Sequence, residues 1–313
     1  MSDNILNPVL KEALAQPGDP NATPVEKQHP DVAREEFVND LAAVDKEAPS
    51  MREVRDLKVP GPVTDLEARL YMPDNAPASG PIMIYYHGGG NIRGNIGTHD
   101  STCRVLANAG SFPILSIEYR LAPEHPFPAA ADDAFSALKW ASQHASDIGG
   151  DSSKILVGGD SAGGNLAAAV CIRARDESGP AIAAQMLIYP VIDHVGEYES
   201  KKLYSKGYML DSMPFYTASY LPDPENRKSP MASPIYAESH SSLPPAFILT
   251  CGFDPLHDEG CAYATKLRAA GVTVDQENYP DMIHGFTLLR GLLPEADPAL
   301  EDAARRTLKL IGY

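Results

Sequence analysis

One serine of the chain lies in a pattern that suits a nucleophile. Residues 159–163 read GDSAG and match G-x-S-x-G, between the apolar run KILVG (154–158) and an alanine-rich helical segment. Small residues at such a strand-to-helix turn let the backbone bend sharply and present the Ser161 hydroxyl at the edge of a sheet. The motif alone leaves two interpretations open: a catalytic serine, or a glycine-lined turn where a strand packs on a helix.

Other glycine-loop chemistries do not fit these residues. A phosphate-binding P-loop needs a lysine after its last glycine, whereas Asn165 follows Gly164. The segment also lacks the G-x-G-x-x-G spacing of a dinucleotide site. Both kinds of nucleotide site are therefore excluded here.

A second glycine cluster, HGGG at 87–90, follows the strand-like run PIMIYYH. Loops of this kind bring unobstructed backbone N–H groups to the oxyanion of an acyl-transfer intermediate. Its position upstream of G-x-S-x-G favours catalysis over an ordinary glycine turn. We interpret His87 as a residue that shapes the loop rather than as a base.

An acid and a histidine follow the serine in the order that this chemistry requires. Asp254 comes after the strand-like run AFILTCG, and His284 comes after the next one, VDQENYP. Both are expected at the carboxyl ends of strands, where the sheet of an α/β protein carries its active site. His284 would take the proton of Ser161, and Asp254 would orient the imidazole.

Other acidic residues and histidines have competing explanations. Asp193 also follows a strand-like run and is the alternative acid. Asp258 is expected to cap the helix that follows it and Asp281 to lie in a turn, while Asp160 either tunes hydrogen bonding beside Ser161 or stabilises the turn. The histidines without strand-end placement are expected to be solvated or structural: His99, His125, His194, His240 and His257.

Short apolar runs alternate with helical patterns along most of the chain. Continuous apolar strands that alternate with helices predict an α/β protein with a mainly parallel sheet covered by helices on both faces. The first strands are so close in sequence that we expect the sheet to begin with antiparallel pairing. Strands are expected at 67–72, 81–87, 112–119, 154–158, 183–190, 246–252 and 274–280, and helices at 8–15, 31–44, 98–109, 129–144, 165–176, 260–270 and 298–311.

Two segments interrupt this alternation. Residues 1–50 are polar and are expected to form N-terminal cap helices. Residues 191–235 are too long for a bare loop and carry aromatic residues at helical spacing, which predicts a helical cap insertion. The α/β core would then comprise residues 51–190 and 236–313.

Composition excludes several classes of function. The 313 residues carry a formal net charge of −16, and such a field repels nucleic acid and anionic membrane surfaces. No apolar run is long enough to span a bilayer, and the first residues lack a secretory pattern, so we expect a cytoplasmic protein. The cysteines show no metal-ligand spacing and are expected to be reduced and mostly buried: Cys103, Cys171, Cys251 and Cys261.

The motifs HGGG, EYRLAPEHPFPAA, GDSAGGNLA, DPLHDEG and HGF occur in the order seen in bacterial hormone-sensitive-lipase-like (family IV) carboxylesterases. From about residue 67 to residue 313, the chain resembles the GDSAG subgroup of that family. The segments expected as a cap are similar in type to the family's cap. The resemblance implies an α/β-hydrolase fold with a helical cap.

The resemblance also implies hydrolysis of short- to medium-chain carboxylic esters through an acyl-enzyme intermediate, with no metal or organic cofactor. It implies Ser161 as nucleophile, Asp254 as acid and His284 as base. The backbone N–H groups of Gly88, Gly89 and Ala162 would form the oxyanion hole. Members often dimerise through the last edge strand, which would here be 274–280.

The substrate pocket is the least determined part of the site. At Asn91 the family usually carries an aromatic residue, and the smaller polar side chain is expected to widen or rehydrate the adjacent pocket. Candidate pocket residues in the cap are Tyr204, Tyr208, Phe215 and Tyr216, with packing inside the cap as the equal alternative.

Two other functions remain open on the sequence. An amidase or lactonase of the same fold would use the same triad. A non-catalytic small-molecule receptor on this scaffold is less expected, because plant gibberellin receptors, which resemble the family, have lost the catalytic histidine, whereas His284 is present.

Overall fold

The computed structural model describes residues 5–16 and 22–313 of the chain. Its centre is one sheet with the strand order β1-β2-β4-β3-β5-β6-β7-β8. β2 pairs antiparallel with β1 and β4, and all later neighbours are parallel. The strands are β1 (Glu53–Val59), β2 (Leu66–Met72), β3 (Gly80–Tyr86), β4 (Ile114–Ile117), β5 (Gly150–Asp160), β6 (Ala184–Ile188), β7 (Ala246–Phe253) and β8 (Val274–Ile283).

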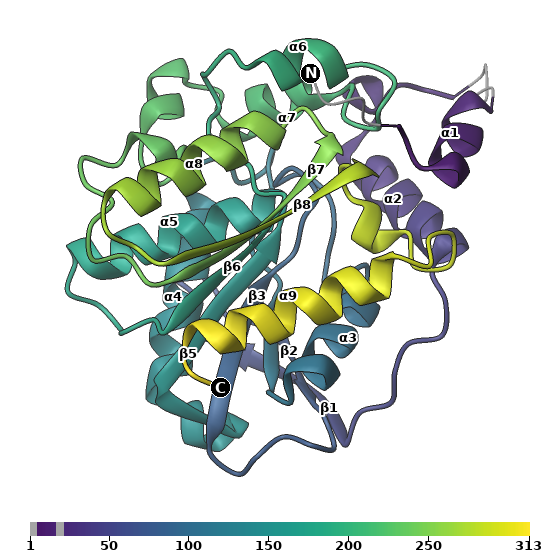
Figure 1. Cartoon of the computed structure of the whole chain (residues 1–313). Coiled ribbons are helices and arrows are strands. Elements are labelled where there is room, and N and C mark those ends of the chain that lie inside the picture. The colour runs from purple at the N-terminus through teal and green to yellow at the C-terminus, as the bar shows by residue number, and fades with distance from the viewer. Residues whose placement is uncertain (1–4, 17–21) are drawn as a thin grey trace.

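Helices cover both faces of this sheet (Figure 1). α3 (Asp100–Gly110) and α9 (Ala296–Leu310) pack on one face, and α4 (Ala129–Gln143), α5 (Ala162–Asp176) and α8 (His257–Ala269) pack on the other. β3 shows why both faces are apolar. Its Ile82 and Ile84 join the α4–α5 side of the core, whereas Met83 and Tyr85 join the α3–α9 side. A strand buried on both faces needs a continuous apolar run, and that is the pattern of β3, β6, β7 and the second half of β5.

The remaining helices lie near the carboxyl ends of the parallel strands (Figure 1). They come from the two segments that interrupt the alternation. The helices are α1 (Pro8–Ala15), α2 (Pro30–Val44), α6 (Glu199–Tyr204) and α7 (Met213–Tyr220). Short 3₁₀ turns are not confined to these segments and occur at Val25–Lys27, Ala145–Ile148, Pro224–Lys228, Pro234–Tyr236 and Phe286–Leu288.

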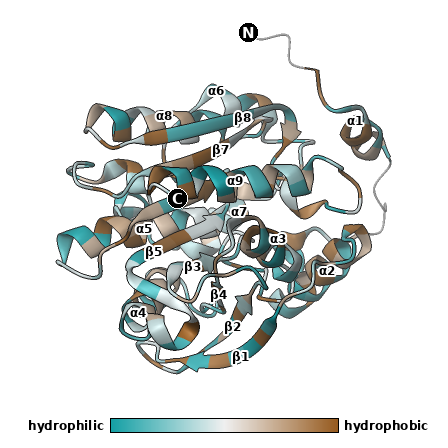
Figure 2. Cartoon of the chain, turned by 60° about the horizontal axis from the view of Figure 1, so that its bottom comes forward, coloured by the Kyte–Doolittle hydropathy of each residue, from teal (hydrophilic) through white to brown (hydrophobic). Residues whose placement is uncertain are grey.

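The α/β fold class predicted from the sequence is confirmed. Every strand and helix expected by residue range is present, and the antiparallel start of the sheet is also confirmed. β1 was not among the expected strands because most of its side chains are exposed and polar, so it has no apolar run. At the other edge of the sheet, Figure 2 shows a hydrophilic strand β8 (teal) beside the hydrophobic inner strand β7 (brown). Both edge strands, β1 and β8, are therefore hydrophilic.

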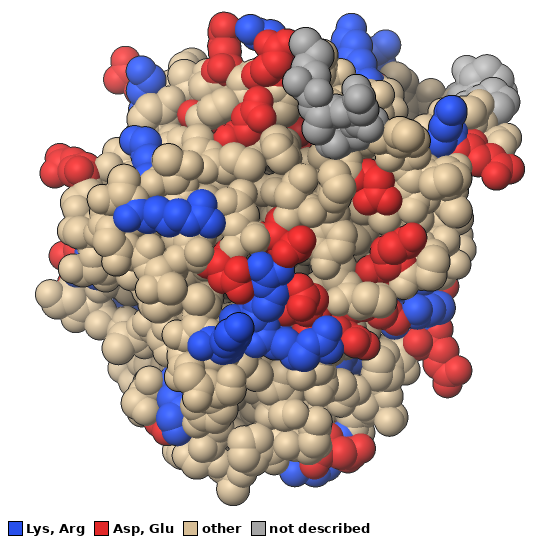
Figure 3. All heavy atoms as spheres, in the orientation of Figure 1, with Lys and Arg blue, Asp and Glu red and all other residues tan. Residues whose placement is uncertain are grey.

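The negative net charge does not gather in one patch on the face shown in Figure 3, where acidic and basic side chains lie intermixed. Arg306 on α9, for example, pairs with Asp275 and Glu277 of β8 and with Asp302. In the described residues no helix is both long and apolar enough to cross a membrane.

Candidate active site

The serine of the GDSAG motif sits on a strained turn between β5 and α5. Ser161 has φ 54° and ψ −116°, a conformation that non-glycine residues rarely adopt. The flanking glycines are required by space: a Cβ on Gly159 or Gly163 would collide with the Tyr86 carbonyl oxygen of β3. The turn therefore brings α5 against β3 and turns the Ser161 hydroxyl away from the core, as the motif predicts.

Ser161, His284 and Asp254 form one hydrogen-bonded chain. His284 Nε2 is 2.9 Å from Ser161 Oγ, and His284 Nδ1 is 2.9 Å from Asp254 Oδ2. Asp254 is fully buried, and its Oδ1 accepts a hydrogen bond of 2.8 Å from the Leu256 N–H, which holds the carboxylate in position. The three residues follow β5, β7 and β8, so the parallel pairing of these strands brings them to one edge of the sheet.

The alternative acid, Asp193, lies in a different environment from Asp254. Asp193 accepts hydrogen bonds from the Val195 and Gly196 N–H groups and from the hydroxyl of Tyr198, and none from His284. Asp193 is therefore bound within its own turn in the described structure.

Two smaller expectations about acidic residues are wrong. Asp258 lies in the first turn of α8, but its carboxylate accepts from the Ser200 N–H at the start of α6, because that cap helix packs against it. Asp281 lies inside β8 rather than in a turn, since β8 continues to Ile283.

The HGGG loop supplies a different pair of N–H groups from the pair expected. The N–H of Gly88 donates to Asp160 Oδ1 at 2.9 Å, so it is not available to a substrate, and the expectation that Gly88 is an oxyanion donor is wrong. Gly89 and Gly90 have φ values of 122° and 68°, line the cavity and make no N–H hydrogen bond to a described residue. Ala162 opens α5, so its N–H has no partner within the helix.

Asp160 connects the nucleophile turn to this loop. Its buried carboxylate accepts from the Tyr85 hydroxyl at 2.8 Å and from Gly88, and it lies 3.1 Å from His99 Nε2. Burial alone would raise the pKa of Asp160, but the nearby His99 and the hydrogen bonds from His99 and Tyr85 lower that pKa below its ordinary value. An ionised Asp160 therefore holds the Gly88 peptide in place.

His87 shapes the loop, as expected, rather than serving as a base. It is fully buried, stacks on Tyr119 with 4.3 Å between ring centroids, and its Nδ1 lies 2.8 Å from the Gly88 carbonyl oxygen. Burial, with repulsion from His99, lowers the pKa of His87 to about 3. The imidazole is therefore neutral at physiological pH.

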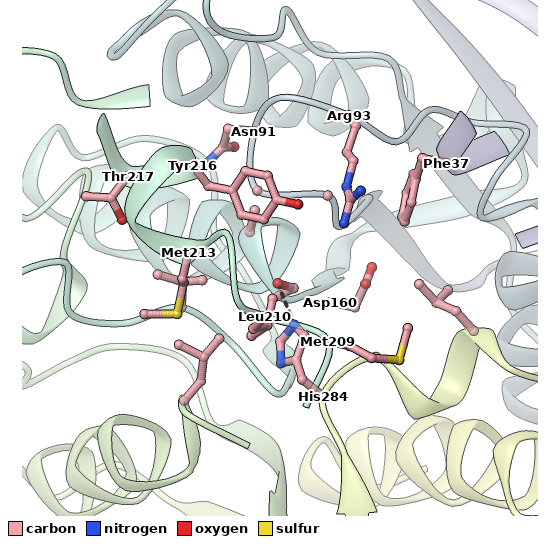
Figure 4. A pocket seen from close by; sticks show the side chains of 18 of the residues that line it. Phe37, Asn91, Arg93, Asp160, Met209, Leu210, Met213, Tyr216, Thr217 and His284 are labelled. Carbon is pink, nitrogen blue, oxygen red and sulfur yellow. Dashed lines mark hydrogen bonds between the residues drawn. The ribbon is translucent and has the colours of Figure 1, made fainter. Parts of the chain in front are cut away.

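A cavity of about 1040 Å³, its open mouth included, lies over Ser161 and His284 (Figure 4). Of the expected pocket residues, Asn91 and Tyr216 line it. Tyr204 and Tyr208 do not line it but pack against Phe253, and Phe215 packs on the core. These three side chains therefore pack against the α/β core rather than line the pocket, and Tyr204 also contacts Tyr208 within the insertion.

Several lining residues were not identified from the sequence. Phe37 and Leu41 come from α2, and Met209, Leu210 and Met213 come from the insertion before and within α7. Apolar residues in a cap have no signal that separates pocket lining from packing. Arg93 also lines the cavity, and its position two residues after Asn91 in the glycine-rich loop was a signal that could have found it.

Asn91 owes its place to backbone geometry as well as to the pocket. It has φ 60°, a left-handed conformation that asparagine tolerates better than most residues. Its Oδ1 is buried and has no hydrogen-bond partner in the described part of the chain. Among the described residues, no group of three or more His, Cys, Asp or Glu side chains is placed to hold a metal ion.

Comparison with known proteins agrees with this geometry. A family model described as alpha/beta hydrolase fold matches residues 83–288. The carboxylic ester hydrolase LipN of Mycobacterium tuberculosis is 45% identical over 242 residues, which are 75% of this chain and 64% of LipN. The esterase LipI of the same organism is 40% identical over 259 residues, 80% of each protein.

A solved structure is similar over nearly the whole chain. An ester hydrolase from the metagenome of Lake Arreo matches with a TM-score of 0.92 and 38% identity, covering 99% of this chain and 100% of that one. The chain therefore belongs to the α/β-hydrolase family. Within that family its relatives are carboxylic ester hydrolases and esterases, so the resemblance to bacterial carboxylesterases is confirmed.

Proposed function

We propose that the chain hydrolyses short- to medium-chain carboxylic esters through an acyl-enzyme intermediate on Ser161. The observation that carries this proposal is the hydrogen-bonded chain from Ser161 through His284 to Asp254, at the floor of a cavity. The activities named for LipN and LipI support an ester as the bond that is cleaved.

In the first half of the proposed reaction, Ser161 Oγ attacks the ester carbonyl carbon while His284 Nε2 takes its proton. Asp254 stabilises the imidazolium that forms. The N–H groups of Gly89, Gly90 and Ala162 hold the oxyanion. The imidazolium then gives its proton to the departing alcohol as the carbon–oxygen bond breaks.

In the second half a water molecule, deprotonated by His284, attacks the acyl group on Ser161. The same oxyanion donors act again, and collapse of the intermediate releases the acid and restores the serine hydroxyl. One ester and one water thus give one acid and one alcohol. No group outside the described residues is needed for either proton transfer.

The lining of the cavity supports an acyl chain of limited length. Leu210, Met213, Leu256 and Leu289 present apolar surface near the serine. An apolar wall with a few polar groups is typical of pockets that bind small ligands, and it suits the hydrocarbon part of an ester. Phe37 and Leu41 of α2, together with lining residues of the segment 191–235, would form the wall and roof of this pocket.

Hydrolysis of 4-nitrophenyl butyrate by wild type and Ser161→Ala tests the proposal. We expect the variant to lose activity by about 10⁴-fold or more, because the nucleophile is gone. Ser142→Ala, at a half-buried serine of α4 outside the cavity, is the matched control and should keep full activity. Equal rates for wild type and Ser161→Ala, or no hydrolysis of any ester by wild type, would refute the assignment.

Two further arms sharpen the test. Asp254→Asn should lower kcat by about 10⁴-fold, whereas Asp193→Asn should not, which separates the two candidate acids. A matched 4-nitroanilide should react far more slowly than the ester. Faster cleavage of the anilide would assign the site to an amidase instead.

The chain is also proposed to form a cytoplasmic homodimer through β8. β8 supports the dimer, because it is an edge strand with unpaired backbone groups on one side. The four free cysteines support the location, because thiols stay reduced in the cytoplasm. Sedimentation at several concentrations tests the dimer, and cell fractionation tests the location.

A further inference from the structure

Arg93 extends from the glycine-rich loop into the cavity over the triad (Figure 4). Two aromatic rings hold its guanidinium: Cζ lies 4.3 Å from the centroid of Phe37 and 5.2 Å from that of Tyr216. Such stacking fixes the plane of a guanidinium while leaving its edge nitrogens open. The edge nitrogens of the guanidinium, which form a planar fork, are thus pre-oriented beside the reacting groups.

Arg93 has no anionic partner within the described part of the chain. Its half-buried side chain makes no ion pair or hydrogen bond with a described residue, and its Nε is buried. An arginine in a partly closed cavity ordinarily faces a carboxylate or phosphate, because its charge is costly to desolvate unpaired.

The other charged side chains that line the cavity already have partners. Lys201 pairs with Glu259 at 2.6 Å. Asp160 faces His99, and Asp193 is bound by N–H and hydroxyl donors of its own turn. Within the described structure, neither Asp160 nor Asp193 forms an ion pair with Arg93.

We propose that Arg93 binds a carboxylate group of the substrate, so that the preferred substrates are esters that also carry a carboxylate a few bonds from the scissile carbonyl. This inference rests on the proposed esterase function and adds a substrate class to it. A single monoanion suits the site better than a phosphate, because one unpaired cation faces a cavity that also contains Asp160 and Asp193. The planar fork matches the two oxygens of a carboxylate.

The carboxylate can belong to the acid part or to the alcohol part of the ester. Two substrate pairs distinguish these cases, with acid release followed by titration at constant pH. Monoethyl glutarate is compared with ethyl valerate for the acid part. 4-Acetoxybutyrate is compared with butyl acetate for the alcohol part.

Arg93→Met and Arg93→Lys are the test variants. For the pair in which the carboxylate reaches Arg93, we expect Arg93→Met to lower the ratio of kcat/KM for the anionic ester to that for the neutral ester by about 30-fold. Arg93→Lys keeps the charge but loses the fork, so it should lower the ratio less. Added salt should lower the wild-type rate for the anionic ester and leave the neutral ester unchanged.

Arg34→Met is the matched control. Arg34 donates to the Ile92 carbonyl of the same loop, but its charge is paired with Glu124 at 2.6 Å and it does not line the cavity. Loosening of the loop in this variant should lower both rates of a pair together. The ratio of anionic to neutral ester should therefore stay at the wild-type value.

Neutral esters separate the two proposals. An unchanged ratio in both pairs for Arg93→Met, or hydrolysis of only the neutral esters by wild type, would overturn the role of Arg93 while the esterase function stands. If wild type hydrolyses none of the four esters, the esterase function itself fails and this inference fails with it.

Discussion

Replacing Asp160 by asparagine tests whether the residue beside the nucleophile holds the oxyanion loop. The carboxylate accepts from Tyr85 and Gly88 and faces His99. Hydrogen bonds to a charged group contribute about 1.5–3 kcal/mol and neutral ones about 1 kcal/mol, so Asp160→Asn weakens the tether on Gly88 by about 1 kcal/mol.

The effect on rate follows from what the tether positions. Gly89 and Gly90 directly follow Gly88, and loss of one oxyanion donor costs about 3 kcal/mol. The increase in activation free energy for Asp160→Asn should lie between the cost of weakening the hydrogen bond from Gly88 and the cost of losing one oxyanion donor. That corresponds to a decrease in kcat of about 10- to 100-fold. KM should change little, because Asp160 acts on the transition state through the loop.

The assay measures initial rates with 4-nitrophenyl butyrate, and active sites are counted with a fluorophosphonate so that unfolded molecules do not contribute. Asp193→Asn is the matched control: Asp193 is 3% exposed against 2% for Asp160 and lines the same cavity. Its kcat should stay near the wild-type value. An unchanged kcat in Asp160→Asn, or equal losses in both variants, would refute this reasoning.

Two other variants test the local structure. Buried His87, with its pKa of about 3 against 6.5 in the unfolded chain, takes up a proton only on unfolding, so stability should fall as pH drops below 6.5, by about 2 kcal/mol at pH 5. His87→Gln should remove that part of the pH dependence, measured by urea unfolding at pH 5 and pH 7. The same loss of unfolding free energy between pH 7 and pH 5 in His87→Gln and in wild type would contradict this prediction. Gly163→Ala should prevent α5 from seating on β3 and abolish activity, because the new Cβ overlaps a backbone carbonyl. Gly207→Ala is the control, because a Cβ there meets no atom within 4 Å; its free energy of unfolding should fall by only about 1 kcal/mol, owing to the φ of 79°. Equal decreases in melting temperature for Gly163→Ala and Gly207→Ala would count against the steric argument.

The core and the hydrogen-bonded group of Ser161, His284 and Asp254 could be predicted because their signals are local. Strands buried on both faces must be apolar runs, so the central strands β3, β4, β6 and β7 were visible, whereas the exposed edge strand β1 was not. Parallel strands carry their carboxyl ends to one edge, so a serine, an acid and a histidine that each follow a strand are expected near one another there, although the choice of Asp254 over Asp193 needed the structure. The positions of Ser161, Asp254 and His284 follow from that rule.

The substrate side of the site was decided by the tertiary structure. Which glycine N–H groups face the substrate depends on backbone directions and on Asp160, which takes the N–H of Gly88 and leaves those of Gly89 and Gly90 free. In the same way, Tyr216 reaches the cavity whereas Tyr204 packs against Phe253.

The sequence by itself thus predicted the fold and the grouping of Ser161, Asp254 and His284, because strand periodicity and motif order act over a few residues at a time. The tertiary structure alone decided which N–H groups of the glycine loop are free and what surrounds Arg93. Those depend on contacts between segments that are far apart in the chain, such as α2 and α7 on either side of one arginine.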